Sequence, residues 1–128
     1  MNDQQAINYL LQRGEPYGLT LNDLKDMAPA CVSDCMVELA EFYRVSDLSH
    51  IYPQSTHPHI ANDPTNIFPE DPSVNRSRGA DIVTEAERIV ADHDRELLAR
   101  QIDAEIQLDG SHPPLDLIPD WVPVFGLL

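Results

Sequence analysis

Nine of the eleven prolines in this chain fall in two stretches, residues 50–79 and residues 110–128. Each proline removes a backbone hydrogen-bond donor and biases the residue before it toward extended geometry. In the first stretch the prolines recur every three to six residues, a spacing that leaves no room for a regular helix or a central strand. We therefore expect an extended strap over 50–79 and an extended arm over 110–128, with helices confined to 1–49 and 80–109 of a single domain.

Residues 1–49 carry the signals of three short helices. Asn2 or Asp3 can cap a first helix that ends near Arg13. Thr20 and Asp23 have the spacing of a capping box, here with the shorter acid, and predict the start of a second helix. A third helix is predicted by apolar residues that recur at helical spacing after Pro29, namely Val32, Met36, Leu39, Ala40 and Tyr43.

Residues 80–109 predict one long amphipathic helix, so the expected fold is mainly α: a small helical body and a long helix in the second half, with an extended strap and a C-terminal arm. The main apolar face at 100° per residue consists of Ile82, Ala86, Ile89, Val90, His93, Leu97, Ala104 and Leu108. A second apolar row lies well over 90° away and consists of Leu98, Ile102 and Ile106. A helix with one packing surface does not need both rows, so we expect the second row to be covered by another surface.

The C-terminal arm is rich in large apolar residues and includes the only tryptophan of the chain. Left free in water, such a peptide would promote aggregation. It can fold back over the second row of the long helix, or it can dock in a groove on another chain; both possibilities stay open. The residues predicted to bind a partner are therefore Leu98, Ile102, Ile106, Leu115, Leu117, Ile118, Trp121, Val122, Val124 and Phe125.

The formal net charge is −14, from 22 acidic and eight basic residues. This charge should repel nucleic acids and acidic membrane surfaces, so the expected partners are other protein subunits with basic or apolar grooves in a hetero- or homo-oligomeric assembly. The N-terminus lacks the pattern of a signal peptide, which predicts a cytoplasmic protein, or a virion component if the chain is viral. Arg76 and Arg78 form the one local excess of positive charge, and we expect them to pair with acids of the long helix or of a partner.

Two groups of residues suggest chemistry only weakly. His57 and His59 flank Pro58, and side chains two apart in an extended segment point the same way, so both could reach one metal ion. No acidic ligand fixes their geometry. Cys31 and Cys35 lie four apart on the predicted third helix, where buried reduced thiols are expected rather than a disulfide or a zinc site. No glycine-rich phosphate loop, nucleophile motif or cofactor motif is present.

These features favour a non-enzymatic structural or adaptor subunit that docks through extended arms, with a minor component of a viral particle as one instance. The alternative is an acidic regulator that imitates nucleic acid and occupies the site of a basic partner. A third hypothesis is a small metalloenzyme that uses His57 and His59.

Overall fold

The computed structural model describes residues 1–108 of the chain. Six α-helices and one two-stranded antiparallel sheet form this part, so the predicted mainly α class is confirmed, and so is the long helix in the second half. The predicted C-terminal arm, residues 110–128, lies outside the described residues.

The N-terminal helices begin where the capping residues predict. α1 (Asp3–Gly14) starts after Asn2, which forms a capping box with Gln5, and α2 (Leu21–Met27) starts after the predicted capping box of Thr20 and Asp23. The predicted third helix is divided into α3 (Ala30–Ser33) and α4 (Met36–Arg44), because the backbone at Cys35 is extended. Cys31 and Cys35 therefore lie on separate elements rather than on one helix.

Residues 50–79 contain more regular structure than their prolines suggest, and helix α5 (Pro72–Arg78) shows that the prediction of no regular helix in this stretch is wrong. Strand β2 (Ile67–Glu70) pairs with β1 (Asp47–His50), and helix α5 follows it. Pro69 is tolerated in β2 because a two-stranded sheet has only edge strands, where a missing N–H group does not interrupt a ladder on both sides. Two short 3₁₀ helices, η2 (Pro58–Ile60) and η3 (Pro64–Asn66), lie in the connection between the strands.

The buried side chain of Asn66 holds this connection together. Its Nδ2 donates to the carbonyl oxygens of Tyr52 at 3.2 Å and Ile60 at 3.3 Å, and its Oδ1 accepts from the Tyr52 N–H at 2.9 Å. Asn66 thus forms hydrogen bonds with backbone groups of Tyr52 and Ile60 that have no place in a regular ladder. The connection between the strands is a folded loop, and the prediction of an extended strap does not hold there.

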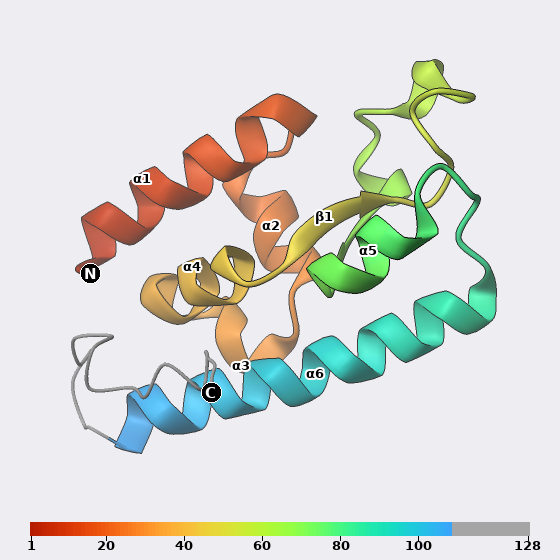
Figure 1. Ribbon diagram of the computed structural model, residues 1–128. Coiled ribbons are helices and arrows are strands. Elements are labelled where there is room, and N and C mark those ends of the chain that lie inside the picture. The colour runs from red at the N-terminus through yellow and green to blue at the C-terminus, as the bar shows by residue number, and fades with distance from the viewer. Residues whose placement is uncertain (109–128) are drawn as a thin grey trace.

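Helix α6 (Glu85–Leu108) runs along one side of the molecule, beside α3, α4 and α5 (Figure 1). Its N-terminal half contacts β2, and its later turns contact α3 and α4. The main hydrophobic core lies between α1, α4 and α6 and includes Leu10, Val32, Leu39, Phe42, Tyr43, Leu48, Ala99, Ile102 and Ile106. A smaller cluster of Phe68, Val83 and Ala91 joins β2 to the start of α6.

Candidate protein-binding surface on α6

The structure reverses the predicted roles of the two apolar rows of α6. Ile102 and Ile106, which we predicted to bind a partner, are buried in the main core against the other helices, and Leu98 is half-buried at its edge. These residues are therefore part of the core, and the surface that covers the second row is the helical body itself. The predicted main face is instead exposed to solvent.

We call the exposed side of α6 the outer face and define it by Ile89, Val90 and Leu97. Their side chains are 63%, 68% and 57% exposed. His93, in the same predicted stripe, is exposed as well. An apolar stripe of this kind on a helix whose opposite side is already packed is typical of a contact surface for another protein.

Small residues explain why the other side of α6 packs inward. Ala91 and Ala99 are buried, and they lie on the same side of the helix as Ile102 and Ile106. Small side chains allow the helix to come close to its neighbours, because the distance between packed helices depends on the side chains at the contact. The position of α6 is thus determined by two alanines that carry little weight in a hydrophobic pattern.

Arg95 also lies on the inner side of α6, and it is one of the few charged residues that are buried. Its Nη1 donates to the Val45 carbonyl oxygen at 3.1 Å and to the Ser46 hydroxyl at 2.8 Å. Its Nη2 pairs with Asp94 at 2.8 Å and lies 3.6 Å from a carboxylate oxygen of Asp71. Arg95 therefore joins α6 to the turn between α4 and β1.

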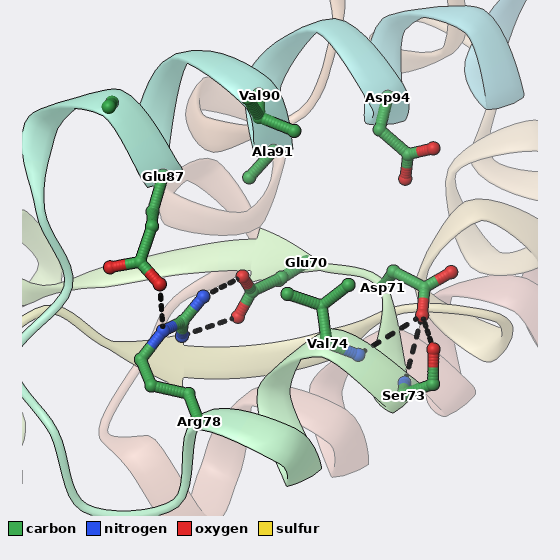
Figure 2. A pocket seen from close by; sticks show the side chains of 10 residues that line it. Glu70, Asp71, Ser73, Val74, Arg78, Glu87, Val90, Ala91 and Asp94 are labelled. Atoms are coloured by element: carbon green, nitrogen blue, oxygen red, sulfur yellow. Dashed lines mark hydrogen bonds and ion pairs between the residues drawn. The ribbon is translucent and has the colours of Figure 1, made fainter.

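A pocket of about 390 Å³ opens between α5 and the N-terminal half of α6 (Figure 2). Val74 on α5 and Val90 on α6 form its apolar walls, and Ala86 and Ala91 add to the α6 side. Val90 belongs both to the pocket and to the outer face, so the two form one continuous surface.

A buried ion pair forms one end of the pocket. The guanidinium of Arg78 makes a bidentate contact with Glu70, and its Nε lies 3.2 Å from a carboxylate oxygen of Glu87 on α6. Glu70 also accepts a hydrogen bond from the Ser49 hydroxyl at 2.9 Å. The hydrogen bonds to Glu70 raise the pKa of Arg78, and the pair joins α5, both strands and α6. The prediction that Arg78 pairs with an acid of the long helix is confirmed by Glu87.

The charges at the rim of the pocket differ sharply in exposure. The side chains of Arg78 and Arg95 are only 5% and 6% exposed, whereas those of Glu87, Asp71 and Asp94 are 41%, 38% and 51% exposed. Hydrogen bonds from Thr84 and Arg78 lower the pKa of Glu87. Burial acts to raise the pKa of Asp71, but hydrogen bonds from Ser73 and Val74 outweigh it and the pKa is lowered. A molecule that approaches the pocket thus meets carboxylates around an apolar surface.

The two histidines that were candidate metal ligands lie near each other on the loop between the strands. The ring centroids of His57 and His59 are 6.1 Å apart, and Nδ1 of His57 lies 2.8 Å from the Thr56 hydroxyl. Within residues 1–108, no three or more histidine, cysteine or acidic side chains are arranged to hold a metal ion. This part of the chain therefore offers no support for the metalloenzyme hypothesis.

The two cysteines are half-buried thiols, and no disulfide joins them. Burial is the main cause that raises the pKa of both Cys31 and Cys35, which keeps the thiols protonated near neutral pH. A protonated thiol is a poor nucleophile. The geometry agrees with a packing role for both residues.

Comparisons of this chain with protein-family models, with curated proteins and with solved structures found no match. No helix within residues 1–108 is both long and apolar enough to span a bilayer. The surface on α6 is therefore interpreted from its own chemistry.

Sequence patterns did not predict most of the pocket between α5 and α6. Val74 and Asp71 lie in the proline-rich stretch, where we expected no helix, and no spacing in the sequence connects them with Val90 and Asp94. The predicted partner-binding residues Leu115, Leu117, Ile118, Trp121, Val122, Val124 and Phe125 lie outside the described residues and stay predictions.

Proposed function

We propose that this chain is a non-enzymatic adaptor subunit of a larger protein assembly. The observation that carries the proposal is the outer face of α6, where Ile89, Val90 and Leu97 are exposed on a helix whose opposite side packs into the core. Burying such a stripe against a partner would remove apolar surface from water. Each Å² buried would stabilise the complex by about 25 cal/mol. The apolar C-terminal arm supplies a second contact in this proposal, and a virion is one setting for such an assembly.

Co-purification from the cell of origin tests the adaptor function. The full chain, tagged and expressed at its natural level, should elute from a sizing column in a complex and should cross-link to defined partners. The double variant Ile89→Asp/Leu97→Asp should elute as the free chain, because two carboxylates on the outer face would have to be buried without counter-charges.

The matched control adds the same charge elsewhere. Gln4→Glu/Asn8→Asp places two carboxylates on the exposed side of α1 and should leave the complex intact. Removal of residues 111–128 tests the arm separately. A wild-type chain that elutes alone at its natural level, with no cross-linked partner, would show that it is not an adaptor.

A second candidate is the acidic regulator that imitates nucleic acid, and one observation favours it. Around the pocket the arginines are buried and the carboxylates are exposed, so the surface is more acidic than the composition alone implies. This function requires binding to a basic protein that nucleic acid displaces and that rising salt abolishes. Association that persists in high salt and involves the outer face would support the adaptor instead.

A further inference from the structure

The pocket between α5 and α6 combines three properties that together describe what it can bind. Val74 and Val90 are exposed on opposite sides of it, so an entering group meets apolar walls. Its volume of about 390 Å³ lies within the range of sites that enclose a small group, about 300–1,000 Å³. It also opens onto the outer face through Val90, so an occupant can continue along α6.

The rim of the pocket favours a positively charged neighbour of that entering group. Glu87, Asp71 and Asp94 are all partly exposed. Arg78, which pairs with Glu87 (Figure 2), and Arg95, which pairs with Asp71 and Asp94, are buried. An incoming lysine or arginine would gain charge-assisted contacts without displacing an internal ion pair. An incoming carboxylate would meet the exposed carboxylates of the rim, because the arginines are buried.

The two occupants that this chain itself can supply do not match the rim. Residues 109–128 contain Asp109, Asp116 and Asp120 and no lysine or arginine. A second copy brings a net charge of −14, which opposes close approach of two acidic surfaces. Charge complementarity therefore points to a different molecule.

We propose that this pocket binds a basic segment of a protein partner, which inserts an apolar side chain between Val74 and Val90 and places lysines or arginines against the rim. The inference rests on the adaptor function proposed above and names the chemistry of the partner. The apolar side chain supplies the contact area, and the flanking cations determine orientation and discriminate against acidic segments.

A peptide titration tests the proposal with defined probes. The full chain, labelled at its valine and alanine methyl groups, is titrated with a capped amphipathic peptide whose leucine stripe is flanked by lysines. We expect saturable shifts at the methyl resonances of Val74, Val90 and Ala91, weakened by added salt. The same peptide with glutamate in place of lysine, and one with serine in place of leucine, should each bind at least tenfold more weakly.

Two pairs of variants locate the binding. Val74→Ser removes a pocket wall without changing the charge and should weaken binding at least tenfold, whereas Leu11→Ser, at an equally exposed leucine of α1, should not. Asp94→Asn removes one rim carboxylate and should weaken binding several-fold, whereas Glu15→Gln makes the same charge change away from the pocket and should not. Thermal melts of all four variants exclude unfolding as the cause.

Several results would overturn the proposal. Equal binding of the lysine and glutamate peptides, shifts confined to other parts of the surface, or no binding of any peptide would each do so. Shifts at Val74 and Val90 on removal of residues 111–128 would identify the chain's own arm as the occupant, and shifts on dilution would identify a second copy. If the natural complex forms equally well with Val74→Ser and is lost with Ile89→Asp/Leu97→Asp, the adaptor function stands and the pocket is not its site.

Discussion

Arg95 shows how a single buried cation can connect distant parts of this protein. Its guanidinium satisfies the Val45 carbonyl and the Ser46 hydroxyl at the end of α4, and Asp94 compensates its charge. The Ser46 hydroxyl cannot recover this bond from bulk water, because Ser46 is buried. The side chain is therefore structural, in contrast to Arg100 on the same helix, whose ion pair with Glu96 is exposed.

Replacing Arg95 by methionine should lower the free energy of unfolding by about 3 kcal/mol, because it leaves buried acceptors without donors. Arg100→Met is the matched control. Arg100 forms an exposed pair with Glu96 one turn apart, and its loss should change the free energy of unfolding by no more than about 0.5 kcal/mol. Urea denaturation followed by circular dichroism measures both, and equal effects would show that Arg95 is not a structural link.

The ion pair of Glu70 and Arg78 allows a second comparison. Glu70→Ala should lower the free energy of unfolding by about 3–5 kcal/mol, because it leaves the buried guanidinium with only the half-exposed Glu87. The double variant Glu70→Leu/Arg78→Met should recover most of this loss, since two apolar side chains of similar size need no charge compensation. A double variant as unstable as Glu70→Ala would indicate that packing around the pair, rather than its charge, is what matters.

Helix α6 has two apolar sides, one buried in the main core and one exposed to solvent. Truncating one isoleucine on each side distinguishes them. Ile102→Ala should lower the free energy of unfolding by about 2–4 kcal/mol, because it opens a cavity in the main core. Ile89→Ala removes the same atoms from the outer face and should change it by no more than about 0.5 kcal/mol. Denaturant titration of the two variants measures the difference in their free energies of unfolding. A larger loss for Ile89→Ala would show that the predicted main face, and not the second row, is the buried side of α6.

The existence of α1, α2 and α6 could be predicted, but α5 and the orientation of α6 could not. The spacing of Thr20 and Asp23 predicted the start of α2, because a capping box depends only on local hydrogen bonds. The buried side of α6 depends on how closely α3 and α4 approach it. Ala99 lies in the core that α6 shares with α3 and α4, whereas Ala91 packs in the cluster with Phe68 of β2. A pattern that counts large apolar residues gives both alanines little weight.

Three of the five prolines of residues 50–79 mark where helices begin, and this is why the strap prediction failed. Pro58, Pro64 and Pro72 each lie in the first turn of a 3₁₀ or α-helix, where the missing N–H group would have no partner. Asp71 then caps α5 by accepting from the backbone N–H of Ser73. We expected a helix after Pro29, but we did not expect helices to begin at these later prolines. Helix α5 and the pocket wall that it carries were therefore missed.

The acidity of the protein extends into its interior, where α4 and α6 meet. Burial raises the pKa of Glu38 to about 7, and the nearby Asp103 carboxyl adds to the effect, while Gln107 donates to Oε2 of Glu38 at 3.2 Å. Burial likewise raises the pKa of Glu105 to about 7, and the charge of Glu41 contributes. Both carboxyls therefore favour the protonated form in the folded state more than in the unfolded chain.

This arrangement predicts an unusual dependence of stability on pH. The ordinary pKa of Glu38 is 4.5, so its stabilising contribution is complete below that pH and is lost as the pH rises through about 7. Asp71 and Glu87 act in the opposite direction, because their pKa values are lowered and their contribution is lost in acid. The free energy of unfolding should therefore be greatest in mildly acidic solution and fall between pH 5 and pH 8, with Glu38 contributing on the order of 3 kcal/mol.

Glu38→Gln separates the contribution of Glu38 from that of Glu105. The amide keeps the shape and cannot ionise, so the variant should lose less stability than the parent between pH 5 and pH 8, retain the loss due to Glu105, and equal or exceed the parent in stability at pH 8. Glu15→Gln on the exposed surface should follow the parent at every pH. Urea titrations across this range measure the three proteins, and a Glu38→Gln profile as steep as that of the parent would place the linked proton on another group.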